Sequence, residues 1–293
     1  MIIRKRKINK NQYYYLEHSF KVGKKVRKKE KYLGKVIPKN IDKIKEDFML
    51  DIKKEKFFNG LDKIKSNFSE DFRKMPKSAK EKYIENFMIK FTYNSNRIEG
   101  SSITLKETAR LLEDNIAPKK PIKDIKETES HKKVFYEMLD YKKDLSLNII
   151  LFWHRHLFEN TDKEIAGRIR NHNVEVAGSK SEFPFPAELE TLLREFFIWY
   201  NKNKDKIHPL ELAALVHLKF VSIHPFTDGN GRISRIMMNF VLNKSNYPML
   251  NIAYRNRDTY YTALERSQVK KIDYIFVQYL IKRYLREYRK YSK

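Results

Sequence analysis

Residues 209–223 form a stretch that is apolar on nearly every side when it is drawn as a helix. Such a helix has no face to turn toward water, so other elements have to surround it. The chain has only eight glycines and nine prolines in 293 residues, which disfavours a glycine-rich all-β or collagenous fold. We therefore expect a mainly α-helical body with residues 209–223 as its buried central helix.

The helical patterns around this segment have recognisable ends. Residues 77–98 carry one apolar face, and Gly100 stands where a C-terminal cap belongs. Thr104 and Glu107 have the spacing of a capping box, which predicts a helix start. We expect further helices at 105–114, 121–143, from 146 onward, 186–203, 231–244, 258–268 and 272–291.

One segment interrupts the helical rhythm of the body. In residues 167–186, Val174 and Val176 alternate with polar neighbours, and Gly178-Ser179-Lys180 supplies a turn. This pattern predicts a short β-hairpin flap between two helices.

Residues 1–40 differ from the rest in composition. Aromatic and β-branched residues flank a glycine turn at Val22-Gly23-Lys24-Lys25, which is typical of a β-hairpin. The same residues hold fourteen Lys or Arg and two Glu, a net +12 of the +25 of the whole chain. Such an arm favours an acidic partner, namely nucleic acid, an anionic surface or a nucleotide, and the alternative is that its lysines only solvate an exposed face. We predict a basic hairpin module at 1–40, a helical connection at 41–89 and the main helical domain at 90–293.

Composition also excludes several classes of protein. The chain has no cysteine, so a disulfide scaffold, a cysteine-type zinc finger and a cysteine nucleophile are ruled out. It has no apolar run of eighteen residues, and no apolar stretch follows the charged N-terminus as in a secretory signal. We expect a cytoplasmic protein without a membrane span.

The loop after the central helix carries the strongest chemical signal. It reads His224-Pro-Phe-Thr-Asp-Gly-Asn-Gly-Arg-Ile-Ser-Arg235 and leads into the next helix. Gly229 and Gly231 leave no side chain in the way, so backbone N–H groups can close on an anion at a helix N-terminus. Asp228 is a hard carboxylate suited to Mg²⁺, and His224 can take a proton near pH 7.

The helix that follows presents polar and apolar faces. At 100° per residue its apolar residues fall on one side, and the opposite side carries Arg232, Arg235, Asn239 and Asn243. Guanidinium forks match phosphate oxygens, so loop and helix together predict a di- or triphosphate site. The alternative is a surface loop whose Asp caps a helix. The chain lacks the glycine-rich phosphate motifs of P-loop NTPases and protein kinases.

The loop resembles a known family signature. Residues 224–235 match the HPFxDGNGRxxR pattern of Fic-domain proteins at every defined position. Residues 95–100, SNRIEG, look like that family's inhibitory [ST]xxxE[GN] helix, with Ser95 and Glu99 at the defining positions. Residues 167–186 look like its target-guiding flap. The resemblance covers about residues 90–270 and leaves 1–89 outside.

This resemblance implies an activity and residue roles. Fic proteins are nucleotidyltransferases that usually move AMP from ATP to a hydroxyl of a target protein, so a protein adenylyltransferase acting on Ser, Thr or Tyr is implied. By analogy His224 would be the base and Asp228 would hold Mg²⁺ against the phosphates. The remaining nucleotide-binding positions would be Gly229, Asn230 and Gly231 as anion hole, Arg232 and Arg235 on the phosphates, and Asn239 near the nucleoside.

The resemblance further implies restraint of the activity by Glu99. Two rival readings stay open: removal of AMP from a modified protein, and a nucleic-acid-binding regulator in which the Fic-like core only senses nucleotide. Sequence names no target, and self-modification and a homodimer also stay open.

Several other residues have two readings each. We expect His154 and His156 to be surface or partly packed residues rather than metal ligands, because positions i and i+2 do not share a helix face. His217 is expected in the core. Tyr260 and Tyr261 pack or line the nucleoside pocket. Arg168 and Arg170 contact phosphate or target, or are ordinary solvated charges.

Overall fold

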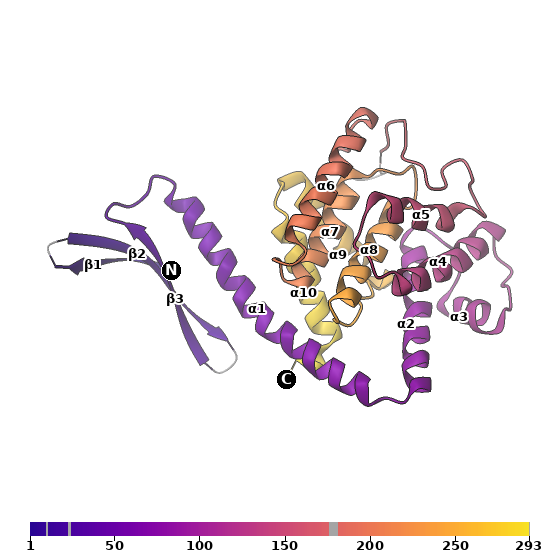
Figure 1. Cartoon of the computed structure of the whole chain (residues 1–293), viewed down its shortest axis with the longest axis horizontal. Coiled ribbons are helices and arrows are strands. Elements are labelled where there is room, and N and C mark those ends of the chain that lie inside the picture. Colours follow the sequence, from indigo (N-terminus) through magenta and orange to yellow (C-terminus); the bar gives the residue numbers. More distant parts are fainter. Residues whose placement is uncertain (10, 23–24, 176–180, 293) are drawn as a thin grey trace. The chain divides into compact units, whose positions relative to one another are not determined.

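The computed structural model describes residues 1–9, 11–22, 25–175 and 181–292. The chain divides into two compact units, Met1–Ile64 with the last residues of the chain, and Lys65–Tyr291. The boundary falls within helix α1 (Ile41–Lys74) (Figure 1). None of the described helices is long and apolar enough to cross a membrane.

The first unit contains a three-stranded antiparallel sheet in the order β1-β2-β3. Its strands are β1 (Ile2–Ile8), β2 (Asn11–Val22) and β3 (Lys25–Gly34). The predicted hairpin corresponds to β2 and β3, which are paired from Val22↔Lys25 onward, and its turn at Gly23-Lys24 lies outside the described residues. Sequence reasoning missed β1, because basic residues fill most of that strand and hide its alternation.

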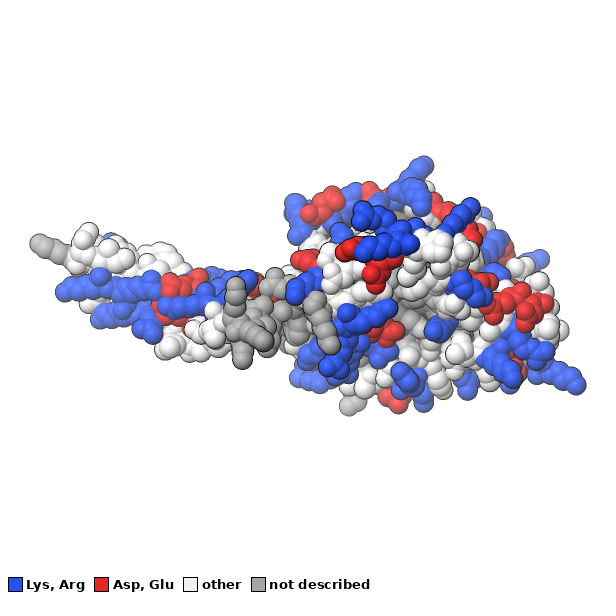
Figure 2. All heavy atoms as spheres, turned by 90° about the horizontal axis from the view of Figure 1, so that it is seen from below, with Lys and Arg blue, Asp and Glu red and all other residues white. Residues whose placement is uncertain are grey.

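One face of this sheet packs on the N-terminal part of α1. Leu16 and Leu33 from the sheet are buried together with Phe48 and Ile52 of the helix. Basic side chains gather on the surface of this unit (Figure 2). The unit therefore has a small apolar core of its own and a strongly positive exterior.

The second unit is helical. Its long helices are α2 (Lys77–Ile98), α3 (Leu105–Asp114), α4 (Ile122–Asp140), α5 (Leu147–Phe158), α6 (Leu189–Asn203), α7 (Pro209–Ile223), α8 (Asn230–Lys244), α9 (Arg257–Lys270) and α10 (Tyr274–Glu287). Short 3₁₀ turns lie at Pro186–Glu188, Tyr254–Asn256 and Arg289–Tyr291. The mainly α fold is confirmed, and so is the capping box that starts α3. Helix α4 ends three residues before its expected end, because the chain becomes extended at Tyr141.

Helix α7 lies at the centre of this unit, as its apolar composition predicts. Twelve of its fifteen residues are buried, and it packs against α6, α8 and α10. A helix held on several sides gives its C-terminal end a fixed position. The loop that begins there, at His224, is therefore anchored to the buried centre of the unit.

The predicted flap is only partly described. Residues 168–175 and 181–185 have no helix or strand, and the expected turn at Gly178-Ser179-Lys180 lies outside the described residues. The described part after it places Phe183 against His224, with ring centroids 4.1 Å apart.

Candidate functional site

The loop between α7 and α8 turns sharply at both ends. His224 caps α7 in the left-handed conformation (φ 51°, ψ 57°), and Gly229 precedes α8 with φ 83°. Between them the Asn230 side chain closes the loop, accepting from the Phe226 N–H at 2.9 Å and donating to the Phe226 carbonyl at 2.7 Å. The Asn230 amide thus fixes the loop's shape.

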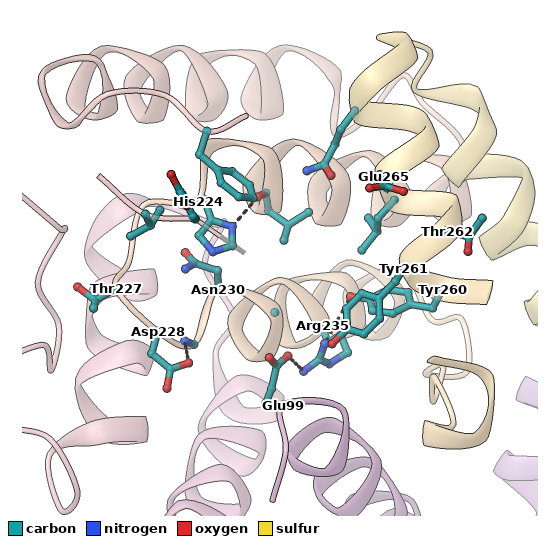
Figure 3. A pocket seen from close by; sticks show the side chains of 18 residues that line it. Glu99, His224, Thr227, Asp228, Asn230, Arg235, Tyr260, Tyr261, Thr262 and Glu265 are labelled. Atoms are coloured by element: carbon teal, nitrogen blue, oxygen red, sulfur yellow. Dashed lines mark hydrogen bonds and ion pairs between the residues drawn. The ribbon is translucent and has the colours of Figure 1, made fainter. Parts of the chain in front are cut away.

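A cavity of about 750 Å³ opens over this loop (Figure 3). Its floor is formed by the loop and the start of α8, with Glu99 at one side. Tyr260 and Tyr261 of α9 line another wall, and Phe183 stands above His224. The volume lies within the usual range for small-molecule sites.

One ring nitrogen of His224 makes a hydrogen bond within the protein, and the other is left to face the cavity. Its Nδ1 lies 3.1 Å from the Val221 carbonyl, which can only accept, so Nδ1 carries the proton. Nε2 is then unprotonated, and the side chain lines the cavity. Burial lowers the pKa of His224 below its ordinary value, so the imidazole is neutral at pH 7. The residue can therefore accept a proton in the cavity.

The two loop glycines are needed for close packing. A Cβ on Gly229 would come within 2.5 Å of the Phe158 ring, and one on Gly231 within 2.2 Å of Glu99 Oε1. The N–H groups of the first turn of α8 have no partner within the helix and meet the positive end of its dipole. Loop and helix start together form an anion-binding cradle.

Arg235 is held from below by helix α2. Its Nη2 donates to Glu99 Oε1 at 2.7 Å and to the Ser95 carbonyl at 3.1 Å, and its Nε donates to Ser95 Oγ at 3.0 Å. Burial alone would lower the pKa of Arg235, but the Glu99 carboxylate outweighs it and the pKa is raised. The predicted facing of Ser95, Glu99 and Arg235 is thus present, with Glu99 at the C-cap of α2.

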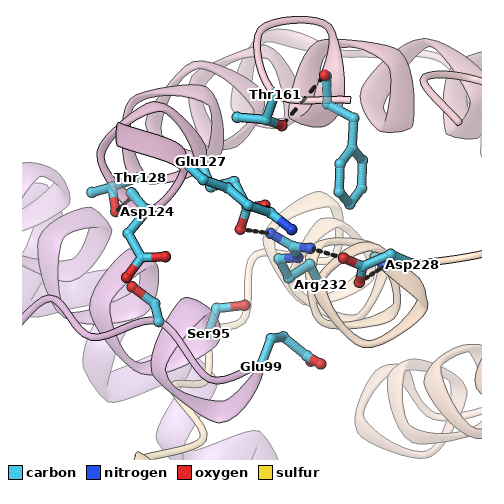
Figure 4. A network of polar contacts seen from close by, with 12 residues as sticks. Ser95, Glu99, Asp124, Glu127, Thr128, Thr161, Asp228 and Arg232 are labelled. Carbon is cyan, nitrogen blue, oxygen red and sulfur yellow. Dashed lines mark hydrogen bonds and ion pairs between the residues drawn. The ribbon is translucent and has the colours of Figure 1, made fainter. Parts of the chain in front are cut away.

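Arg232 has contacts that sequence reasoning did not foresee (Figure 4). Its guanidinium donates to Glu127 on α4 and, at 3.1 Å, to Asp228, and it stacks 4.7 Å from the Phe158 ring. It is 1% exposed and does not line the cavity. In this structure Arg232 is therefore committed to two carboxylates, where we had expected it to face the phosphates.

Asp228 is the cavity's candidate metal ligand. Its side chain is 42% exposed and lines the cavity, while one oxygen contacts Arg232. Burial would raise the pKa of Asp228, but Arg232 overrides this and lowers it, so the group is ionised. The described residues contain no cluster of three or more His, Asp or Glu that could hold a metal alone. One carboxylate beside an anion cradle still fits Mg²⁺, which often takes one or two carboxylates and completes its shell with phosphates and water.

Asn239 does not reach the cavity, contrary to the prediction. It is fully buried, and its amide donates to the Leu250 carbonyl at 3.0 Å and accepts from the Leu250 N–H at 2.8 Å. Both polar ends of the side chain are thus satisfied by one backbone segment. On the polar face of α8 it therefore serves the fold, and it is not among the residues that line the cavity.

Two residues that support the loop were missed. His154 is buried: its Nε2 donates to the Asp228 carbonyl at 3.0 Å and its Nδ1 accepts from the Gly167 N–H at 2.9 Å. Burial lowers the pKa of His154 to about 4. Arg170, also buried, donates to the His224 carbonyl at 2.8 Å and to Pro184 at 2.7 Å. The reading of Arg170 as an ordinary solvated charge was wrong, because it is buried and ties the flap to the loop, and a contact with phosphate or target stays a prediction.

A signal for His154 was in the sequence. It falls on the same helix face as Ile150, Trp153 and Leu157, all of them buried. His217 is a core residue as predicted, and its Nε2 lies 3.0 Å from the Tyr260 hydroxyl.

Comparison with known proteins identifies the domain that carries this loop. Residues 144–242 match the family model described as Fic/DOC family. The chain carries a Fic/DOC domain. Curated proteins named protein adenylyltransferase Fic are similar to it, among them those of Nematostella vectensis (34% identity, 66% of this chain, 45% of that protein) and Drosophila melanogaster (33% identity, 64% and 38%). The chain thus spans less than half the length of these curated relatives.

Solved Fic structures have the same fold. A Fic-domain signaling protein from Bacteroides thetaiotaomicron superposes with a TM-score of 0.70 at 27% identity, over 79% of this chain and 96% of that one. A fragment of Fic-1 from C. elegans gives a TM-score of 0.71 at 25% identity, over 83% and 72%. The likeness extends beyond the matched family segment.

Proposed function

We propose that this protein is a Mg²⁺-dependent protein adenylyltransferase that moves AMP from ATP to a Ser, Thr or Tyr hydroxyl of a target protein. One observation carries the proposal: the unprotonated Nε2 of His224 shares a cavity with the glycine cradle, Arg235 and Asp228. A base, an anion cradle and a cation are what transfer from a triphosphate to a hydroxyl requires. The names of the curated relatives support AMP as the transferred group.

In the proposed reaction His224 Nε2 accepts the proton of the attacking hydroxyl. The hydroxyl oxygen forms a bond to the α-phosphorus, the bond from that phosphorus to the bridging oxygen breaks, and pyrophosphate leaves. Because Phe183 and the Val221 carbonyl hold the ring, Nε2 keeps one orientation toward the cavity. Catalysis then depends on aligning the α-phosphate with this nitrogen.

The phosphates are assigned to the cradle. The N–H groups of Gly229, Asn230 and Gly231 would donate to the α- and β-phosphate oxygens, and Arg235 would donate to the γ-phosphate. The Gly229 N–H would then give up its present acceptor, Asp228 Oδ1. Asp228 would hold Mg²⁺, which neutralises phosphate charge when bound. In this structure Arg232 supports Asp228, so its proposed share in phosphate binding requires Arg232 to change partners.

We infer that Glu99 restrains the reaction. Its carboxylate occupies Arg235 and lies in front of Gly231, where phosphate would approach. Arg235 cannot serve two anions fully, so ATP would bind in a shifted position. A displacement of about 1 Å can cost on the order of a hundredfold in rate.

The experiment is mass spectrometry of the protein and of a cell lysate after incubation with Mg-ATP. We expect added AMP on Ser, Thr or Tyr with the Glu99→Gly variant, less with the parent, and none with Glu99→Gly combined with His224→Ala. Absence of any AMP adduct in Glu99→Gly that still binds Mg-ATP would contradict the proposal. If the parent instead removes AMP from an adenylylated protein and Glu99→Gly does not, the AMP-removing reading is correct.

A further inference from the structure

The N-terminal sheet has one face that its own helix leaves uncovered. Side chains alternate along each strand, and Leu16 and Leu33 belong to the face packed on α1. On each strand, the residues that alternate with this packed set therefore point away from α1. This outer face carries Arg4 and Arg6 on β1, Tyr13, Tyr15 and Glu17 on β2, and Lys28, Glu30 and Tyr32 on β3.

Three tyrosines form a continuous aromatic surface on the outer face. The Tyr32 ring lies 5.3 Å from that of Tyr15 and 6.1 Å from that of Tyr13, measured between centroids. Tyr32 is 54% exposed, so one ring of the group has an open face. The Arg6 guanidinium lies 4.5 Å from the centre of the Tyr15 ring. Aromatic rings on a sheet face, flanked by guanidinium groups, suit the stacking of unpaired bases.

Two glutamates hold the basic side chains beside these rings. Glu17 is only 2% exposed and pairs with Arg4 at 2.7 Å, with Lys28 at 2.9 Å and with Arg6. Glu30 pairs with Arg6 and Lys28, each at 2.7 Å. These are the only two acidic residues among residues 1–40. The two carboxylates therefore hold Arg4, Arg6 and Lys28 in place next to the tyrosines. No other acidic residue of the segment is left to neutralise its remaining basic side chains.

Lys29 pairs with Glu55 of α1 at 3.4 Å, but five further lysines in or next to the sheet are not neutralised. Lys5, Lys7, Lys31, Lys35 and Lys39 have no carboxylate partner among the residues that the structure describes, and all five are exposed. By the strand register, Lys5, Lys7 and Lys31 belong to the same face as Leu16, whereas Lys35 lies beside the outer face, 5.9 Å from the Tyr13 ring centre. Excess positive charge near an aromatic face suits a partner with a charged phosphate backbone and unpaired bases that can stack on the rings.

We propose that the outer face of the N-terminal sheet binds single-stranded nucleic acid, with bases stacked on the tyrosines and phosphates bound by the surrounding Arg and Lys side chains. A duplex keeps its bases stacked inside and offers nothing to Tyr32. A membrane is disfavoured because two carboxylates lie within the face. The proposal does not depend on the nucleotide site of the Fic domain.

The test uses the full-length protein and fluorescence anisotropy with labelled oligonucleotides of about 15 nucleotides, a length close to known single-strand site sizes. The arms are single-stranded RNA, single-stranded DNA, duplex DNA of equal length, and anionic phospholipid vesicles. We expect both single strands to bind at least about tenfold more tightly than duplex at the same salt concentration. The ratio of the two affinities then shows whether the sheet prefers single-stranded RNA or single-stranded DNA.

Matched variants separate stacking from charge. Tyr32→Ala and Tyr32→Leu should each weaken single-strand binding by about five- to tenfold, and Tyr32→Phe should keep it, because only the ring is needed. Replacing Lys35, which lies beside Tyr13, by Ala should lower the slope of log affinity against log salt by about 0.7. Replacing Lys106 and Lys119 of the second unit, also exposed, should leave that slope unchanged.

Three results would overturn the proposal. They are equal affinity for duplex and single strand, unaltered binding by folded Tyr32→Leu, and binding to vesicles alone. Folding of each variant is checked by its thermal melt, and Tyr32→Leu preserves apolar bulk if Tyr32→Ala melts early.

Discussion

The loop before α8 and the N-terminal sheet both hold arginines against carboxylates, but the surroundings are opposite in solvent exposure. Arg232 and Arg235 are each 1% exposed and are fixed by groups from α2, α4 and the loop itself. On the sheet the Arg4 and Arg6 side chains are 59% and 39% exposed. A buried pair fixes its partners in place, since a lone buried charge is very costly, whereas an exposed pair can exchange one anion for another.

The most direct test of this difference in burial is to remove one carboxylate from each region and compare the loss of stability. Glu127→Ala should lower the free energy of unfolding by about 3–5 kcal/mol, because it leaves the buried Arg232 guanidinium short of a partner. Glu30→Ala should leave the unfolding midpoint within error, since water replaces its contacts. Both are measured by urea denaturation. Equal effects would mean that burial does not distinguish the two networks.

A histidine in each region provides the second comparison. His224→Ala should reduce AMP transfer about a hundredfold or more while ATP binding persists, because only the proton acceptor is lost. His18→Ala, on the first unit, should leave the transfer rate unchanged. Rates are taken from AMP incorporation and binding from calorimetry. Full transfer by the His224 variant would remove it from the mechanism.

The restraint proposed for Glu99 gives the third prediction. Glu99→Gly should raise transfer by about tenfold or more, since Arg235 is released for phosphate and ATP can align. Arg235→Ala should not reproduce this gain, because it removes the phosphate contact as well. Glu113→Gly, an acidic residue in the last turn of α3, is the matched control and should have no effect on rate. A Glu99 variant that binds Mg-ATP without faster transfer would refute the restraint.

The pH dependence should show the smallest effect. Burial lowers the pKa of His224, so the base stays unprotonated at neutral pH, and the rate should fall only as pH drops through that lowered value, below about 6.5. Phe183→Ala uncovers the ring and should move the acid limb upward, toward the ordinary histidine value. An acid limb at or above 6.5 in the parent would show that burial does not govern this group.

Much of the fold followed from local rules in the sequence, and much of the site did not. The ends of α2 and α3 were predictable because a capping box and a glycine mark them. The proximity of Glu99 to Arg235 came from the family resemblance together with helix spacing. Glu127 had no signal, because its partner Arg232 lies 105 residues away and only the packing of α4 on α8 brings them together.

Helical-wheel reasoning failed where a polar face is itself buried. Asn239 shares the polar side of α8 with the two arginines, yet the Leu250 segment covers it. Periodicity shows which residues point the same way, and it does not show what lies opposite them. Strand β1 was missed because basic residues occupy both of its faces, Arg4 and Arg6 on one and Lys5 and Lys7 on the other, so no apolar alternation is visible.

The position of Gly231 limits how the restraint proposed for Glu99 could be lost by mutation. Any side chain there would collide with the Glu99 carboxylate and displace it, but it would also stand where phosphate has to approach the helix start. In the proposed mechanism, a side chain at this position would therefore remove the restraint and the phosphate cradle together. Under the proposed restraint, single substitutions that relieve it and preserve transfer are expected only on the α2 side of the contact, at Glu99.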